Sequence, residues 1–115
     1  MKDFNGELHY KDKTYKLVFN LNVMEEIQEE YGTLAQWGEI TDGHDGEPNA
    51  KAVLFGLTAM INEGIDIDNE EREEKVPFVT KKQVGRILTE VGILDATTAM
   101  HDTVIASTQS TEKNE

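Results

Sequence analysis

The segment 49–64, NAKAVLFGLTAMINEG, constrains the fold most because its apolar residues cover most of a helical circumference. At about 100° per residue, the polar residues Lys51, Thr58 and Asn62 fall within one narrow stripe. A helix with so little polar surface must be buried by the rest of the chain. Asn49 is a favourable N-cap, and Gly64 is the residue type that commonly closes a helix. The sequence therefore predicts a central core helix over residues 49–64.

Residues 6–20 alternate between polar and apolar in the way that a β-hairpin does. One face carries Leu8, Tyr10, Tyr15, Leu17 and Phe19, and the polar residues 11–13 interrupt it at the expected turn. An isolated hairpin is only marginally stable in water. The apolar face of this hairpin is therefore expected to pack on the helices.

Two capping patterns predict the helices that precede the central one. Asn22 followed by Glu25 resembles a capping box, and Gly32 is expected to end that helix. Thr33 followed by Gln36 repeats the pattern and predicts a short helix. The residues expected to be buried on the first of these helices are Leu21, Met24, Ile27 and Tyr31, and the short helix carries Leu34 and Trp37.

An acidic segment follows the central helix. Residues 66–74 carry six carboxylates and one arginine, which predicts a solvated, mobile loop. The chain is then expected to return to the core through Val76, Phe78 and Val79.

Two more helices are predicted after this return. Thr80 and Gln83 form a third capping pattern, and the helix over 81–91 is expected to end at Gly92. Asp95 is expected to cap a last helix that ends at Ala106. The residues expected to face inward are Val84, Ile87, Leu88, Val91, Ala96, Ala99, Met100 and Val104.

These elements predict a mainly α (α+β) fold. We expect a small bundle of about four helices, with the short helix after Thr33 grouped with the helix before it, and an N-terminal β-hairpin. Residues 1–106 are expected to form a single helical domain, which is long enough to bury a core of its own. Residues 107–115 offer nothing to bury and are expected to form a disordered polar tail.

The charge balance narrows the classes of partner. Asp and Glu number 23 against 11 Lys and Arg, which gives a net charge of −12. Such a field repels phosphate backbones and anionic membranes, so we expect no binding to nucleic acid or membrane. The chain has no cysteine and no apolar run long enough to span a bilayer, which fits a soluble, intracellular protein.

Two acidic groups invite comparison with metal sites, but their spacing does not match. One group is Asp42, His44 and Asp45, in a segment of turn residues. A calcium loop starting at Asp66 would need glycine at its sixth position and a carboxylate at its twelfth, where Glu71 and Pro77 stand instead. No histidine lies in the pattern of a relayed nucleophile. We therefore expect no metal, no cofactor and no enzymatic activity.

Two aromatic residues are the least explained by the core, and both are candidate partner contacts. Trp37 lies on the short helix, and Phe55 falls beside the polar stripe of the central helix. Exposed aromatic residues often anchor protein partners. The alternative stays open for each: Trp37 closes one edge of the core, and Phe55 packs on the hairpin.

The order of these segments resembles a known family. The chain starts with KDKTYKLVFNLNVMEEIQEEYG, continues with WGEI and VLFGLTAMINEG, and after the acidic segment reads FVTKKQVGRILTEVGI. Over about residues 6–106 this order is similar to that of the tail assembly chaperones of long-tailed phages and prophages of Gram-positive bacteria.

The resemblance implies a mostly helical protein that is made in the host cytoplasm and is absent from the mature virion. It implies that the protein binds the long tape measure protein and keeps it soluble while tail tube subunits polymerise around it. The tail tube protein is a further candidate partner, and self-association stays open. Members of such families are often also made in a longer, frameshifted form. The resemblance carries over no binding residues, because no motif in it fixes them.

Two other functions stay open from the sequence. The first is a small head-to-tail connector or tail completion protein, which would remain in purified virions. The second is an acidic inhibitor that mimics nucleic acid. A mimic predicts carboxylates ordered along one face, whereas here they cluster in one segment and on one helix.

Overall fold

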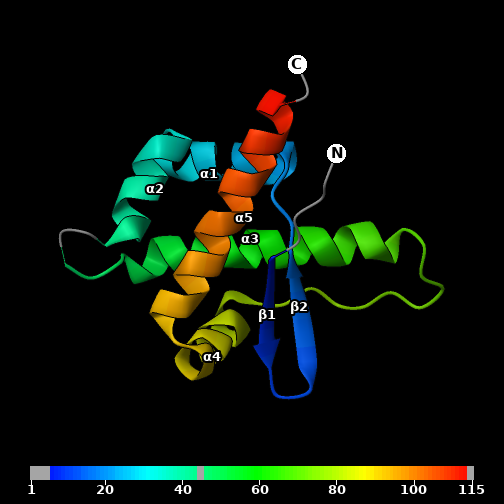
Figure 1. Ribbon diagram of the computed structural model, residues 1–115. Helices are drawn as coiled ribbons and strands as arrows, with labels where there is room; N and C mark the ends of the chain where they lie inside the picture. Colours follow the sequence, from blue (N-terminus) through cyan, green and yellow to red (C-terminus); the bar gives the residue numbers. More distant parts are fainter. Residues whose placement is uncertain (1–5, 44–45, 114–115) are drawn as a thin grey trace.

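The computed structural model describes residues 6–43 and 46–113 and is mostly helical, with an antiparallel hairpin at the N-terminus (Figure 1). Its elements are β1 (Gly6–Tyr10), β2 (Lys13–Leu17), α1 (Leu21–Tyr31), α2 (Leu34–Asp42), α3 (Ala50–Asn69), α4 (Lys81–Val91) and α5 (Ile93–Lys113). The predicted class, helices plus an N-terminal hairpin, is confirmed. The predicted number of about four helices is not, because the described residues form five and α2 is a helix of its own.

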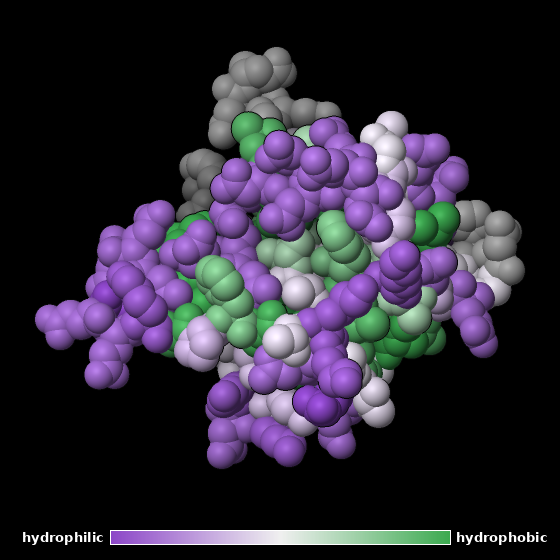
Figure 2. All heavy atoms as spheres, turned by 180° about the vertical axis from the view of Figure 1, so that it is seen from behind, coloured by the Kyte–Doolittle hydropathy of each residue, from purple (hydrophilic) through white to green (hydrophobic). Residues whose placement is uncertain are grey.

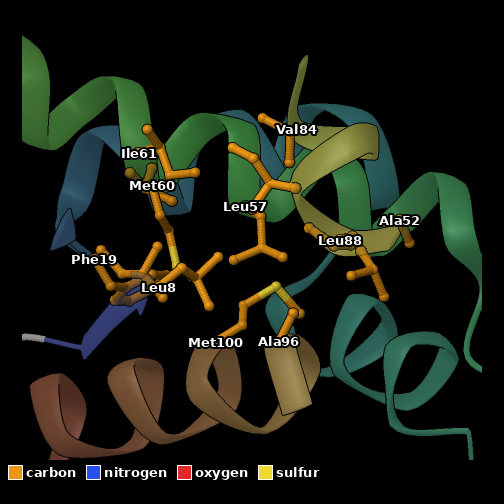
Figure 3. Close-up of a cluster of buried hydrophobic side chains, with 14 of the residues drawn as sticks. Leu8, Phe19, Ala52, Leu57, Met60, Ile61, Val84, Leu88, Ala96 and Met100 are labelled. Carbon is orange, nitrogen blue, oxygen red and sulfur yellow. The ribbon is translucent and has the colours of Figure 1, made fainter. Parts of the chain in front are cut away.

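Helix α3 crosses the middle of the molecule, and every other element contacts it or packs on a neighbour that does (Figure 1). Figure 3 shows Leu57, Met60 and Ile61 of α3 pointing toward Met100 of α5 and toward Leu8 and Phe19 of the hairpin region. All six side chains are buried. The predicted central core helix is therefore confirmed. Among the described residues, no helix combines the length and the apolar composition that crossing a membrane requires.

The predicted end of this helix at Gly64 is wrong, because α3 continues to Asn69. Gly64 is buried in the middle of α3, where a Cβ atom would lie 3.1 Å from the backbone oxygen of Lys16. The backbone N–H of Val18 also donates to the carbonyl oxygen of Met60, at 3.3 Å. The glycine thus lets the end of the hairpin lie directly on the helix. The first four residues of the predicted acidic loop, 66–69, are helical as a result.

The hairpin has the predicted faces. Leu8 pairs with Tyr15 across the two strands, and Gly6 pairs with Leu17. Leu8, Leu17 and Phe19 are buried, while the two tyrosines are half-buried. The apolar face of the hairpin therefore packs on the helices, as its pattern predicts.

Of the five predicted N-caps, three are confirmed, the cap of α1 is shifted, and the predicted cap Asp95 is wrong because α5 already begins at Ile93. The side chains of Thr33, Asn49 and Thr80 each accept the backbone N–H three residues on. Helix α1 is capped by Asn20 in place of Asn22: Asn20 Oδ1 accepts the N–H of Val23 at 3.2 Å. This shift of the start leaves Leu21 77% exposed and buries Val23 with Ile27, so the prediction that Leu21 is buried is wrong.

Helix α5 is longer than predicted at both ends. It begins at Ile93, so Asp95 lies in its first turn, and it continues past Ala106 to Lys113. Ala96 and Met100 are buried as predicted, while Ala99 and Val104 are half-buried. Two threonines that the pattern did not mark, Thr97 and Thr103, are also buried. Residues 107–113, predicted to be a disordered tail, are helical; residues 114–115 lie outside the described part of the chain.

Two asparagines on α3 hold the segment that returns from its C-terminal end. The Asn62 side chain donates to the carbonyl oxygen of Val79 at 3.0 Å and accepts the Val79 N–H at 2.8 Å. Asn69 does the same with Val76, at 3.0 and 2.9 Å. Each side-chain amide thus bonds to both the N–H and the carbonyl oxygen of one residue, as a residue of a neighbouring β-strand does. The returning segment is therefore attached to α3 by its backbone.

This attachment corrects two predicted core residues. Val76 is 40% exposed and Phe78 is 55% exposed, whereas Val79 is half-buried beside the core. Hydrogen bonds through Asn62 and Asn69, and not apolar burial of all three side chains, place the segment.

Trp37 and His101 form the contact between α2 and α5. The two rings meet edge to face with centroids 6.1 Å apart, and Nε2 of His101 lies 2.8 Å from Oγ1 of Thr41. Burial lowers the pKa of His101 below its ordinary value, against the opposing effect of the charges on Asp42 and Asp102. The neutral imidazole is thus the form that fits this contact.

We predict that Asn69→Ala lowers the free energy of unfolding by about 1–3 kcal/mol, because it leaves the N–H and carbonyl of Val76 without their partner. Urea unfolding measures this change, and hydrogen exchange should show faster exchange at the Val76 amide. Asn22→Ala is the control, because Asn22 is an exposed asparagine that bonds only to Glu63 among the described residues. Equal effects of the two substitutions would contradict the role given to Asn69.

We predict that acid weakens the α2–α5 contact through His101. A histidine whose pKa is lowered by folding binds protons more readily in the unfolded chain, so stability falls as the pH drops below the unfolded pKa of about 6.5. The melting temperature of the parent should therefore fall relative to that of His101→Gln between about pH 8 and about pH 5.5. Melting curves followed by circular dichroism test this; parallel pH profiles would contradict it.

Candidate functional site

The first candidate contact, Trp37, lies inside the protein. Its side chain is 1% exposed, and its Nε1–H donates to the carbonyl oxygen of Ala52 at 3.0 Å. Gly56 faces the indole ring so closely that a Cβ atom would collide with it. The structure thus corrects the placement of Trp37 on an exposed patch: this indole closes the core between α2 and α3.

The second candidate, Phe55, is half-buried at the surface of α3. Its ring meets that of Tyr31 at the end of α1 edge to face, with centroids 5.5 Å apart and an interplanar angle of 78°. Such pairs are a favourable aromatic geometry, and here the pair joins α1 to α3. Tyr31 of α1 therefore covers part of the Phe55 side chain, which also packs against the buried core.

Phe55 lies at one end of a surface groove of about 360 Å³. The face of α3 opposite Leu57 forms the floor, Glu26 of α1 lies on one side, and Phe78 and Lys81 lie on the other. The floor residues are Phe55, Thr58, Ala59, Asn62, Glu63 and Asp66. α5 crosses in front of α3 in Figure 1, so the view from behind in Figure 2 shows this side of the molecule. Apolar and weakly polar surface gathers there across the middle, with hydrophilic side chains around and across it.

The wall that carries Phe78 is held by the hydrogen bonds between Asn62 and Val79. Because the Val79 backbone is attached to α3, the neighbouring Phe78 side chain stays at the rim and remains 55% exposed. The groove therefore has one aromatic residue in its floor and another at its edge. The sequence pattern pointed to Phe55 but not to Phe78. The signal that could have found Phe78 was the pair of asparagines, Asn62 and Asn69, about two turns apart on one helix.

Carboxylates dominate the charge of the groove. Glu26, Glu63 and Asp66 line it together with one cation, Lys81. The Glu63 carboxylate accepts hydrogen bonds from the side-chain amides of Asn20 and Asn22, at 2.8 and 3.1 Å, which hold it in place.

The pKa of Glu26 reflects this crowding. Partial burial raises the pKa, and the negative charges of Glu63, Glu25 and Glu29 raise it further. A cation placed beside Glu26 would favour its ionised form and relieve the repulsion. The groove is thus suited to a partner with positive charge.

Two hydroxyl groups beside the groove are buried without a hydrogen-bond partner among the described residues. They are Oγ1 of Thr58 and the phenolic OH of Tyr31. An unsatisfied buried hydroxyl is costly, and such groups are uncommon in folded proteins. A third described hydroxyl in this state, Oγ1 of Thr97, lies on α5, so these groups are not confined to the groove side of α3.

Within residues 6–43 and 46–113, the structure shows no cluster of metal-ligating side chains. Among the described residues, no three His, Asp or Glu side chains gather closely enough to hold a metal ion. His44 and Asp45, which we compared with a metal site together with Asp42, lie outside the described residues. Asp66 and Asp68 lie in the last turns of α3, and Asp68 pairs with Lys16 at 3.2 Å.

The groove thus combines an aromatic floor, an exposed phenylalanine on one wall and carboxylates along its length. Such a surface can hold apolar side chains of a partner while attracting the cations beside them. Comparison with models of protein families, with curated proteins and with solved structures found no significant match to this chain.

Proposed function

We propose that this protein is a phage tail assembly chaperone that binds the tape measure protein and keeps it soluble during tail assembly. The proposal combines the resemblance in the order of the sequence segments with one structural observation, the groove between Phe55 and Phe78. We propose no enzymatic step, because the groove gathers residues suited to contact and not to a reaction.

The dimensions of the groove suit side chains of a helical partner. A volume of about 360 Å³ is at the low end of the range for ligand pockets, and the groove follows α3 from Phe55 to Asp66. An amphipathic helix that lies along such a groove buries apolar residues spaced three or four positions apart. The tape measure protein, as the resemblance describes it, is a long partner that can offer several such segments.

The charge of the chain supports the solubilising part of this role. A net charge of −12 opposes association between complexes, and the carboxylates at Glu26, Glu63 and Asp66 favour partner segments that carry Lys or Arg. In this proposal, apolar contact gives affinity while surface charge keeps the complex in solution. The tail tube protein is a further proposed partner, and the proposed place of action is the host cytoplasm before the virion is complete.

We predict that Phe78→Ser leaves the fold intact but abolishes the solubilising activity. Phe78 is 55% exposed, so its replacement should change the free energy of unfolding by less than about 0.5 kcal/mol. The readout is the soluble fraction of a candidate tape measure protein from the same genome, co-expressed with this chain. The control is Ile105→Ser, an apolar residue that is 50% exposed on α5, away from the groove.

Phe55→Ala provides a second test of the same groove. Because Phe55 is half-buried and contacts Tyr31, this variant should lose less than the roughly 3–5 kcal/mol of a fully buried phenylalanine and should also lose the activity. If both groove variants solubilise the partner as well as the parent does, the groove is not the contact surface. If the parent itself neither binds nor solubilises the tape measure protein, the chaperone proposal is contradicted.

A further inference from the structure

A second surface cleft carries the opposite charge to the rest of the molecule. It lies between the turn of the hairpin and one face of α4, which are neighbours in Figure 1, and has a volume of about 410 Å³. Its lining includes two tyrosines and four charged residues: Tyr10, Tyr15, Lys11, Asp12, Lys13 and Arg86. None of these residues lines the groove of Phe55 and Phe78.

Two elements place the cations around the cleft. On the hairpin, Lys11 adopts a left-handed backbone conformation with φ of 57°, and its Nζ lies 5.3 Å from the centre of the Tyr10 ring. Tyr10 pairs with Lys13 across the turn. On α4, Arg86 comes three residues after Gln83, so both side chains lie on the same side of the helix. The turn and the helix thus direct three cations to one cavity.

The cleft is locally positive although the chain is strongly acidic. Lys11, Lys13 and Arg86 face a single carboxylate, that of Asp12, among the lining residues. At physiological ionic strength, charges separated by more than about 8 Å are largely screened from one another. A ligand inside the cleft therefore interacts more strongly with these three cations than with carboxylates that lie beyond this distance.

The walls add an apolar component to this charge. Tyr10 and Tyr15 are half-buried, and Ile87, which also lines the cleft, is buried. Aromatic rings and an aliphatic side chain offer contact to an apolar group, while Arg86 and the two lysines offer charge-assisted hydrogen bonds to carboxylates. The combination selects a ligand with a carboxylate close to an apolar side chain.

We infer that this cleft binds an acidic peptide segment in which carboxylate and apolar side chains lie close together. The carboxylates bind Lys11, Lys13 and Arg86, and the apolar side chain packs on Tyr10 and Tyr15. Charge complementarity is the observation that identifies the occupant. A nucleic acid fits less well, because three cations in a chain of net charge −12 hold few phosphates. The inference is independent of the proposed chaperone function.

Fluorescence anisotropy with the full chain tests this inference. The probe is a short labelled peptide of alternating leucine and glutamate, and the comparison peptide carries glutamine in place of each glutamate. We expect binding of the glutamate peptide only, and weaker binding as NaCl rises from about 50 mM to about 500 mM. No binding below about 1 mM peptide, or equal binding of the two peptides, would overturn the inference.

Two matched charge reversals locate the binding. Arg86→Glu should lower the affinity for the glutamate peptide about tenfold, because it replaces an attraction inside the cleft by a repulsion. Lys51→Glu changes the net charge of the chain by the same amount at an exposed position on α3, outside the cleft, and should leave the affinity within about twofold of the parent value. Circular dichroism should show both variants folded.

Three outcomes would contradict the location or the ligand class. Equal losses in Arg86→Glu and Lys51→Glu would show that net charge alone governs binding. Tighter binding of a single-stranded oligonucleotide than of the glutamate peptide would show that the cleft is a phosphate site. Displacement of the peptide by inorganic phosphate at equal concentration would show that the apolar walls do not take part.

Discussion

The burial of α3 is the interaction on which the rest of the structure depends. Two glycines let neighbouring elements approach α3 closely. Gly56 lies against the indole of Trp37 on α2, and Gly64 lies against the backbone at Lys16 of the hairpin. A side chain at either position would push α2 or the hairpin away from the helix. The core around Leu57 and Met60 therefore requires both the apolar residues of α3 and the absence of side chains at these two contacts.

The same helix provides a binding surface on its other side. Opposite Leu57, the residues of α3 are mostly half-buried, and α1 and the segment around Phe78 border them without covering them. Asn62 connects the two roles of the helix, because it lies in the groove and also holds the backbone of Val79. Exposure of an aromatic side chain in the groove is thus a consequence of a fixed backbone and does not require a mobile loop.

Local signals predicted much of the fold from the sequence. The N-caps at Thr33, Asn49 and Thr80 and the ends of α4 depend on residues a few positions apart, and the structure confirms them. Asn20 caps α1 in place of Asn22. Which of the two caps the helix depends on where the hairpin ends in space, and the local sequence pattern does not specify that position. Local patterns alone therefore predict that Leu21 is buried, whereas the structure has it exposed.

The candidate site could be predicted only in part, because its geometry arises between distant segments. Phe55 is predictable because it lies beside the polar stripe of α3, which is a property of one segment. Gly64 suggested the end of a helix, whereas in the fold it provides space for the hairpin. The apolar character of Phe78 predicts burial in the core, whereas hydrogen bonds from Asn62 to the neighbouring Val79, 17 positions away in the sequence, keep Phe78 at the surface.

The division of α3 into a packed face and a binding face can be measured at two adjacent residues. Leu57 is fully buried, whereas Thr58 lines the groove with a hydroxyl that has no partner among the described residues. Urea unfolding should show that Leu57→Ala lowers the free energy of unfolding by about 2–5 kcal/mol. Thr58→Ala should leave that free energy unchanged or raise it by up to about 1 kcal/mol, because it removes an unsatisfied hydroxyl and improves helix propensity. Similar losses in the two variants would contradict the account, since both faces of α3 would then be core.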